Sequence, residues 1–427
     1  MGKKLIVLSA DAMVSDDVEY LRTLPNYQKY LSKGCWIQKV ESIYPSVTYP
    51  CHVTMMTGAW PEKHGVTSNY EISEIEKNPI PWVWFHDSVR TDDIFSAAKR
   101  KGLSTASVFW PVTGNHPDID YLIDEYWTQG EGDNLVQAFK RSGSSEDILR
   151  IIERHKDEMR ERIHPMCDEF MISCACDIIR EKKPDLLMIH PANIDAYRHE
   201  RGLFNDCVRR GVEETDRWIG ALMEAVKEAG LEGTVNLVLT SDHGQQEIKR
   251  IMNLNVLLAE RGYIRLDEMG GIIDWKAYCL PNGLSALVYV KDSDCRKEIE
   301  ELLTAWKEEE IYGISEVFTE GEARERFHLG GEFSFVLESD DFTAFGSSCV
   351  RPLMEKCGQK DYRYGNASHG HLPSKGPWPT LIAAGPDFRE NVVIEQARLI
   401  DEAPTYAKLL GCDLRGADGE AVTAILR

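Results

Sequence analysis

The stretch VNLVLTSDHG at residues 235–244 combines the two features that decide the fold of this chain: a continuous apolar run, and acidic and histidine side chains directly after it. KLIVLSA at residues 4–10 leads into Asp11 in the same way, and DLLMI at 185–189 leads into the stretch from His190 to Asp195. Runs of this kind are typical of strands that are buried on both faces of a sheet. In open α/β sheets the ligand site lies beyond the carboxyl ends of the strands. We therefore expect an α/β fold with a mostly parallel sheet, in which these three strand ends share one crevice.

Amphipathic segments between these runs predict helices that flank the sheet. Within 203–229, apolar side chains recur at three-, four- and seven-residue steps, with charged residues between them, at Val208, Val212, Ile219, Leu222 and Val226. Residues 90–101 show a similar pattern and stop at Gly102, a residue type that commonly ends helices. The strongly charged segment 144–182 is also predicted to be helical, but its residues show no pattern that indicates a function.

The composition changes after Leu254 and predicts an inserted subdomain. Between 255 and 365 the pattern is mixed, with strands expected at 285–290 and 333–337 and a helix at 295–308. WPTLIAA at 378–384 then resembles a core strand again. We therefore expect a metal-binding catalytic core made of residues 1–254 and 366–427, and an α+β cap made of residues 255–365.

Charge and composition limit the classes of partner. The chain has 427 residues, a formal net charge of −21 and a pI near 5.1. Because nucleic acids and anionic membranes are polyanions, this charge argues against binding to either, and no apolar run reaches the length of about 18 residues that predicts a membrane-spanning helix. The eleven cysteines are scattered without a CxxC pair, which is typical of free thiols, so we expect a cytoplasmic protein. The sequence does not indicate an oligomeric state.

Three short motifs carry side chains that bind divalent metals. They are DAYRHERG with Asp195 and His199, SDHG with Asp242 and His243, and SHG with His369, and Asp11 adds a carboxylate after the first strand. Carboxylate oxygens and imidazole nitrogens suit zinc and similar ions. Any one of these motifs alone is more consistent with a structural role, because a lone Asp after a strand often caps a helix. Their joint occurrence, each after a predicted strand, favours a metal site.

A hydroxyl and an amide complete the predicted chemistry. Two cations about 4 Å apart can clamp a phosphoryl group, activate a hydroxyl and stabilise the leaving oxygen. Thr48 in PSVTYP (45–50) is the candidate nucleophile, and Pro45 and Pro50 predict a rigid loop around it. Asn69 lies downstream, and its amide could donate to a phosphoryl oxygen. No arginine near Thr48 in the sequence suggests a clamp for a dianion, although the cap could supply one.

The other histidines and the aromatic residues have no such context. The histidines with no predicted role in the site are His52, His64, His86, His116, His155, His164 and His328, whereas His371 could support a ligand from behind. Trp82, Trp84, Phe85 and Trp110 are predicted to belong to the core or to a pocket wall.

These motifs resemble the alkaline phosphatase superfamily, and within it the nucleotide pyrophosphatase/phosphodiesterase branch. The resemblance runs from Leu5 to about Asp387 and is clearest at residues 5–70, 105–114, 184–202, 235–245 and 366–373. YPSVTYPCHVTMMTGAWPEKHGVTSNYE (44–71) is similar to that branch's nucleophile loop through to its phosphate-contacting asparagine, and FWP (109–111) with Gly114 also fits its pattern.

The resemblance implies a two-metal hydrolase of phosphodiester or pyrophosphate bonds. One divalent ion, zinc or manganese in its place, would be held by Asp11, Thr48, Asp242 and His243, and the other by Asp195, His199 and His369. Thr48 would form a covalent phospho-threonine intermediate and Asn69 would bind a phosphoryl oxygen. Tyr49 falls where the family places an aromatic side chain against the substrate's organic group. The substrate would be a small, nucleotide-like phosphate ester.

Alternatives remain open within the same superfamily and outside it. A phosphonoacetate hydrolase-like enzyme or a phosphomonoesterase would use the same ligands. A phosphomutase is less favoured, and a sulfatase is disfavoured because CHV (51–53) does not match the C/S-x-P-x-R motif of that branch. An inactive ligand-binding scaffold would be expected to have lost a ligand or Thr48, and this chain retains all of them.

Overall fold

The structure is a computed structural model that describes residues 3–77, 79–358 and 362–427. Its largest element is an eight-stranded sheet in which β18 alone runs antiparallel to its neighbours. The prediction of a mostly parallel sheet is therefore confirmed. In spatial order the strands are β19 (Val393–Arg398), β2 (Cys35–Glu41), β18 (Leu381–Ala384), β6 (Val235–Thr240), β1 (Lys4–Ser9), β5 (Leu186–Ile189), β3 (Thr105–Val108) and β4 (Tyr121–Ile123).

The register of the three central strands aligns their carboxyl ends. β1 lies between β5 and β6, with Leu8 opposite both Ile189 and Leu239, and Ser9 opposite Thr240. These strands are buried along their whole apolar length, as the continuous runs predicted. The polar residues that follow each strand therefore leave the sheet at one edge, as expected for an open α/β sheet.

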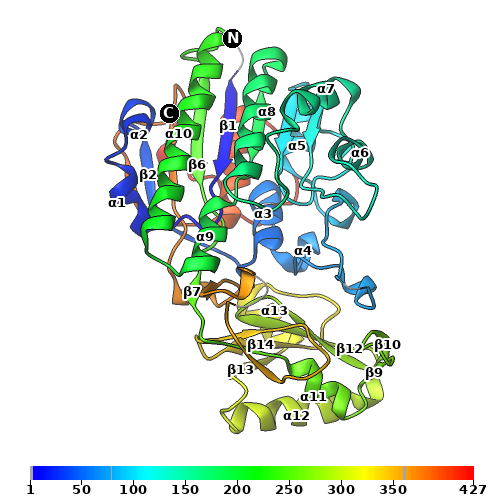
Figure 1. Ribbon diagram of the computed structural model, residues 1–427. Helices are drawn as coiled ribbons and strands as arrows, with labels where there is room; N and C mark the ends of the chain where they lie inside the picture. Colours follow the sequence, from blue (N-terminus) through cyan, green and yellow to red (C-terminus); the bar gives the residue numbers. More distant parts are fainter. Residues whose placement is uncertain (1–2, 78, 359–361) are drawn as a thin grey trace.

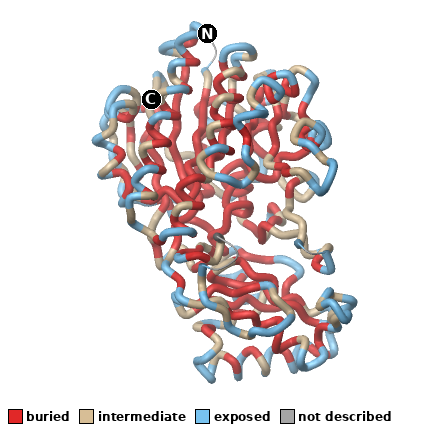
Figure 2. Tube along the Cα trace, in the orientation of Figure 1, coloured by how far each residue is buried: buried red, intermediate tan, exposed pale blue. Residues whose placement is uncertain are grey.

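Helices cover both faces of the sheet (Figure 1). Ile6 and Leu8 point into an apolar core with α7 (Glu146–His155), α8 (Met166–Lys182) and α10 (Asp206–Glu228). Leu5 and Val7 point the opposite way, into a core with α3 (Thr48–Thr57), α5 (Ile94–Arg100) and α14 (Glu402–Leu410). Figure 2 shows the buried residues concentrated along the central strands and in the lower domain, with exposed residues on the outer helix faces and loops.

The cap is a separate domain of strands and helices that lies below the central sheet in Figure 1. Its antiparallel sheet has the order β11 (Ala277–Pro281), β12 (Ser285–Val290), β14 (Phe335–Ser339), β13 (Ile314–Thr319). Its helices are α11 (Leu254–Glu260), α12 (Arg296–Glu308) and α13 (Glu320–Phe327). β8 (Arg250–Met252) lies between β15 (Thr343–Phe345) and β16 (Met354–Lys356), so pairing with cap strands begins a few residues before the predicted boundary at 254.

Among the remaining elements, α9 (Asn193–Arg201) and β17 (Ala367–Ser368) frame the site. α9 follows β5, and β17 pairs with β7 (Gln246–Glu247). The other α-helices and strands are short, namely α1 (Val18–Leu21), α2 (Pro25–Tyr30), α4 (Pro61–His64), α6 (Leu135–Arg141), β9 (Ile264–Leu266) and β10 (Ile272–Trp275).

One local prediction needs correction. Thr48 was expected in a loop, but it is the first residue of α3; Pro50 lies within the first turn, where its missing N–H has no intrahelical partner to lose. The charged segment 144–182 is largely helical, as predicted, and its two helices α7 and α8 are separated by residues 156–165.

One buried carboxylate of the cap joins it to two loops of the core. Glu338 in β14 accepts a hydrogen bond from Tyr44 Oη (2.9 Å) and one from the backbone N–H of Leu372 (3.1 Å). Lys375 forms an ion pair with the same carboxylate at 2.8 Å. Because Tyr44 lies just before Thr48 and Leu372 lies just after His369, this carboxylate holds together the chain segments that carry both side chains.

Within the described residues, none of the helices is both long enough and apolar enough to cross a lipid bilayer.

Candidate active site

The predicted site residues come together at the carboxyl edge of the central sheet. Asp11 follows β1, and Asp242 and His243 follow β6. Asp195 and His199 are four residues apart on α9, so they share one face of that helix. His369 follows β17, and Thr48 opens α3.

The first group of ligand atoms surrounds His243. Its Nε2 lies 3.1 Å from Asp242 Oδ2, 3.5 Å from Asp11 Oδ1 and 3.1 Å from Thr48 Oγ1. Asp11, Asp242 and His243 offer ligand atoms that all lie within 4.8 Å of one another. The candidate nucleophile is therefore within contact distance of one candidate ligand set.

The second group adjoins the first. Asp195, His243 and His369 also offer ligand atoms within 4.8 Å of one another, so His243 belongs to both groups. His199 Nε2 lies 3.4 Å from Asp195 Oδ2, and its Nδ1 donates a hydrogen bond to the carbonyl of Ala367 at 2.7 Å. That hydrogen bond places the proton on Nδ1 and leaves the lone pair of Nε2 for a ligand.

The electrostatics of these groups fit divalent cations. Burial, together with the charges of Asp242 and Asp195, raises the pKa of Asp11 well above its usual value. Burial and the neighbouring His243 and His199 lower the pKa of His369, which keeps its imidazole neutral. Four buried atoms of the set have no hydrogen-bond partner among the described residues, namely Asp11 Oδ1, Asp242 Oδ2, His243 Nδ1 and His369 Nδ1. Clustered carboxylates of this kind need positive charge between them, and neutral imidazoles offer lone pairs to a metal ion.

Two histidines that sequence reasoning did not assign support the ligands. His190 Nε2 lies 3.0 Å from Asp11 Oδ2, and its side chain lines the same cavity. His52 was predicted to have no role, but its Nδ1 donates to the carbonyl of Thr48 at 2.8 Å and lies 3.5 Å from Asp242 Oδ2. His52 is on α3, one turn after Thr48, so only the helical conformation of this segment brings it to the site. His371 is buried and donates from Nε2 to the carbonyl of Gly376 at 2.8 Å.

Asn69 lies beside the start of α3 with its amide group oriented. Its Oδ1 accepts a hydrogen bond from the backbone N–H of Tyr49 at 2.9 Å. Because the oxygen is engaged, the Nδ2 amide is the atom that can donate to a ligand in the cavity, which Asn69 lines.

The expectation for Tyr49 is wrong in this structure. Tyr49 is fully buried, and its ring packs edge-on against Trp82 with centroids 5.2 Å apart. Trp82 lines the cavity, so Tyr49 supports the wall from behind and does not present its own face to a substrate. A residue next to the nucleophile in sequence points elsewhere because consecutive side chains on a helix diverge by about 100°.

The cavity in front of the ligands has a volume of about 350 Å³, which suits a small molecule. Aromatic residues Tyr70, Trp82, Phe109 and Trp127 line it together with Glu125, and the cap contributes Asn282 and Gly283. Three basic residues also line it, namely Arg162, His164 and Arg363. Two arginines therefore line the same cavity as Thr48, although no arginine lies near Thr48 in the sequence. His164, which was predicted to have no role, also belongs to the cavity wall.

Comparison with known proteins places the chain in a sequence family. The family model described as type I phosphodiesterase / nucleotide pyrophosphatase matches residues 5–346. Venom phosphodiesterase 2 of Crotalus adamanteus is 26% identical over 261 residues, which cover 57% of this chain and 27% of that protein. Ectonucleotide pyrophosphatase/phosphodiesterase family member 3 of Bos taurus is 27% identical over 243 residues, covering 54% and 24% respectively. The matched part of the chain thus corresponds to about a quarter of the length of these relatives.

Solved structures show the same fold. Murine ectonucleotide pyrophosphatase/phosphodiesterase 5 superposes with a TM-score of 0.70 and 19% identity over the full length of both chains. An inactive threonine-to-alanine variant of that murine protein, in complex with AMP, has the same TM-score of 0.70.

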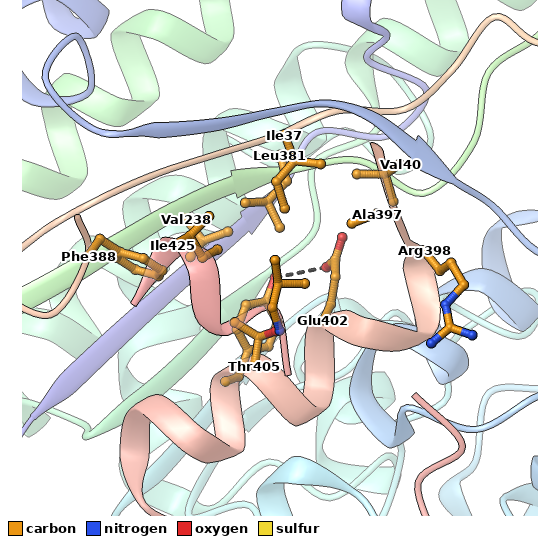
Figure 3. Close-up of a pocket in the computed structure, with 12 residues that line it drawn as sticks. Ile37, Val40, Val238, Leu381, Phe388, Ala397, Arg398, Glu402, Thr405 and Ile425 are labelled. Atoms are coloured by element: carbon orange, nitrogen blue, oxygen red, sulfur yellow. Dashed lines mark hydrogen bonds between the residues drawn. The ribbon is translucent and has the colours of Figure 1, made fainter. Parts of the chain in front are cut away.

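A second, much smaller cavity lies between the central sheet and α14. It is lined mainly by apolar side chains such as Ile37 of β2 and Leu381 of β18 (Figure 3). Its volume of about 10 Å³ is at most that of one water molecule, so it is no substrate site. Glu402 reaches toward it and accepts hydrogen bonds from Thr240 Oγ1 (2.7 Å) and Tyr406 Oη (2.8 Å). Burial raises the pKa of Glu402 to about 8. Glu402 therefore anchors the end of β6, just before Asp242, as a largely neutral acid.

This environment predicts how stability depends on pH. In the unfolded chain Glu402 ionises near its ordinary value of 4.5, whereas in the folded protein it holds its proton up to about pH 8, so unfolding between these values releases a proton. Wild-type stability should therefore fall, relative to Glu402→Gln, as pH rises through that window, by up to about 1.4 kcal/mol per pH unit. Urea unfolding of both proteins at several pH values measures the difference.

The matched control is Glu395→Gln in the exposed strand β19. This variant should follow the wild-type pH profile. A constant offset between wild type and Glu402→Gln across the window would contradict a buried, protonated Glu402.

Proposed function

The chain belongs to the type I phosphodiesterase / nucleotide pyrophosphatase family, and from this membership and the geometry of the site we propose that it is a two-metal hydrolase of phosphodiester or pyrophosphate bonds in small, nucleotide-like substrates. The observation that carries the proposal is the position of Thr48 Oγ1, 3.1 Å from His243 Nε2, at the ligand that both candidate metal groups share. A hydroxyl at this point is close to both groups at once.

The ligand sets build on the two groups: His243 is assigned to the first, and His199, whose Nε2 lies 3.4 Å from Asp195 Oδ2, is added to the second. Asp11, Thr48, Asp242 and His243 would hold one ion, and Asp195, His199 and His369 the other. Zinc suits this mixture of imidazole and carboxylate donors, and manganese could replace it. When bound, the two ions would lower the pKa of the Thr48 hydroxyl and offset the negative charge that gathers on the phosphoryl oxygens.

The chain's own residues perform the displacement. Thr48 Oγ attacks phosphorus and forms a covalent phospho-threonine while the leaving group departs, and water then cleaves the Thr48–phosphorus ester in a second displacement. The Nδ2 amide of Asn69, oriented through Tyr49, donates to a non-bridging oxygen, and this hydrogen bond strengthens as charge develops there. His52 holds the carbonyl of Thr48 and so fixes the first turn of α3.

The cavity supports a substrate of limited size. Its volume of about 350 Å³ admits a nucleotide-sized molecule, and Trp82 and Trp127 offer flat surfaces to an organic group. The acidic chain makes a nucleic acid polymer an unsuitable partner. A phosphonoacetate-type or monoester substrate would meet the same ligands, and an assay with aryl phosphodiesters, aryl phosphomonoesters and phosphonoacetate separates these activities.

Metal content is the first test. We expect two divalent cations per chain at saturating metal, because seven side chains supply donors for two adjoining sites. His369→Ala should lose one ion in preference to the other, since His369 serves only the group with Asp195 and His199. Elemental analysis of the purified proteins measures both values. A wild-type stoichiometry that stays at one or zero would rule out the dinuclear site.

Removal of the nucleophile is the second test. Thr48→Ala should reduce turnover of an aryl phosphodiester by about three orders of magnitude or more, because alanine offers no oxygen to attack phosphorus. At least one ion should remain bound, since the other ligands are unchanged. Two successive in-line displacements give net retention at phosphorus, so inversion with a chiral thiophosphate substrate would exclude the covalent intermediate.

The role of Asn69 gives the third test. Asn69→Ala should cost about 2–4 kcal/mol of transition-state stabilisation if its amide binds the developing oxyanion. We also expect kcat/KM to be higher for an aryl ester of a nucleotide than for the matching aryl monoester. Steady-state kinetics measure both quantities. An unchanged Asn69→Ala variant would contradict the role of its amide, and equal activity on the monoester would contradict the proposed preference for diesters.

A further inference from the structure

The connection between α7 and α8 places two basic side chains on the cavity wall. Arg162 and His164 both line the cavity that also holds Asp11, Asp195 and His199. Neither residue belongs to the proposed metal sites or to the displacement at Thr48. Their position therefore needs an explanation of its own.

His164 is held rigidly with respect to the metal-binding helix. Its Nδ1 lies 2.6 Å from Asp168 Oδ2, and Asp168 Oδ1 accepts a hydrogen bond from the backbone N–H of Ala192 at 2.8 Å. Asp168 is fully buried, and Ala192 directly precedes α9, which carries Asp195 and His199. A buried carboxylate on Nδ1 fixes the orientation of the ring and favours the imidazolium form.

Neighbouring carboxyl groups favour the cationic form of His164. Burial lowers its pKa, but Asp168, Asp195 and Glu125 raise it by more, so that the net pKa lies above the ordinary value of 6.5. Cys167 Sγ is also close, 3.4 Å from Nδ1. The imidazolium can thus donate to an acceptor in the cavity.

Arg162 makes cation–π contacts with two aromatic rings. Its guanidinium carbon lies 5.6 Å from the ring centre of Trp82 and 5.5 Å from that of Trp127, two walls of the cavity. Stacking on aromatic faces uses the plane of the guanidinium and leaves its N–H edge for hydrogen bonds. Across residues 3–77, 79–358 and 362–427, Arg162 has no ion pair within 4.0 Å.

Two acids lie close to these basic groups: Asp168 pairs with His164, and Glu125 lines the cavity. Burial raises the pKa of Glu125 to about 8, although Arg162, Tyr49 and His164 each lower it. Near neutral pH the Glu125 carboxyl is mostly protonated and leaves the charge of Arg162 in place, whereas Asp168 offsets the charge of a protonated His164. The charge of Arg162 stands out in a chain whose net charge is −21, because the overall field repels anions.

A singly charged diester does not require these groups. The proposed metal ions balance its one negative charge, and the Asn69 amide donates a hydrogen bond to it. We propose that Arg162 and His164 form a second anion-binding subsite, and that the substrate carries an anionic group, a phosphate or a carboxylate, in addition to the phosphoryl group that reacts. This inference rests on the proposed function, because it describes the same cavity.

A pair of substrates with the same reacting phosphoryl group tests the subsite. A nucleoside triphosphate has additional phosphates, whereas the 4-nitrophenyl ester of the same nucleotide has none. For Arg162→Ala and for His164→Asn, the ratio of kcat/KM for the triphosphate to kcat/KM for the aryl ester should fall about tenfold or more, since each variant removes a charge-assisted hydrogen bond. Arg160→Ala removes the same charge from an exposed side chain that hydrogen-bonds only backbone carbonyls, and it should leave the ratio and both activities unchanged.

The kind of anion is distinguished by a second pair, a nucleotide ester of 4-carboxyphenol and the corresponding phenyl ester. A preference for the carboxyphenyl ester that Arg162→Ala and His164→Asn abolish identifies a carboxylate subsite. The same loss confined to the triphosphate identifies a phosphate subsite. Either result supports the proposal.

Three outcomes would overturn it. Variants of Arg162 and His164 that leave both ratios unchanged, while the wild type hydrolyses the aryl ester, would refute the subsite and leave the proposed function intact. Higher activity of Arg162→Ala and lower activity of Glu125→Gln on a diester bearing a quaternary ammonium would assign the wall of Trp82, Trp127 and Glu125 to a cation. A wild type that hydrolyses none of these esters refutes the proposed function itself, and the subsite with it.

Discussion

Three carboxylates buried in one crevice are the constraint on which the rest of this structure depends. Asp11, Asp195 and Asp242 come from different elements and converge on His243 and His369. Burying like charges together costs far more than any hydrogen bond between them can return, so the arrangement is stable in its ionised form only with positive charge among them. The same electrostatic cost raises the pKa of Asp11 well above its usual value. A divalent metal centre would supply this positive charge, and carboxylate and imidazole donors suit it.

The surrounding fold holds these side chains in place. The shared register of β5, β1 and β6 sets the depth at which Asp11 and Asp242 leave the sheet. From the cap, Glu338 binds both the segment before Thr48 and the segment after His369, so the cap takes part in assembling the site. Behind β6, the neutral Glu402 anchors Thr240 without adding a further negative charge next to Asp242. Each of these contacts joins residues that are distant in sequence.

The cavity is charged differently from the protein as a whole. The surface field of an acidic chain repels anions, whereas Arg162, His164 and Arg363 line the cavity next to the candidate metal ligands. An anionic substrate would therefore be attracted only at short range, where the basic side chains, together with the cations that we propose bind there, outweigh the more distant acids. The segment between α7 and α8 supplies two of these groups, Arg162 and His164, which we propose bind a second anionic group of the substrate.

The sequence by itself determined the class of fold and the candidate ligands. The apolar runs before Asp11 and Asp242 predicted β1 and β6, because strands buried on both faces must be continuously apolar, and the four-residue spacing of Asp195 and His199 puts both on one face of a helix. Tertiary structure alone decided which other side chains reach the site. His190 and His52 support the ligands, and Arg162 and His164 form the cavity wall, while Tyr49 is turned into the core. These roles depend on side-chain direction and on contacts between distant segments, and neither is encoded in local periodicity or in the spacing of a motif.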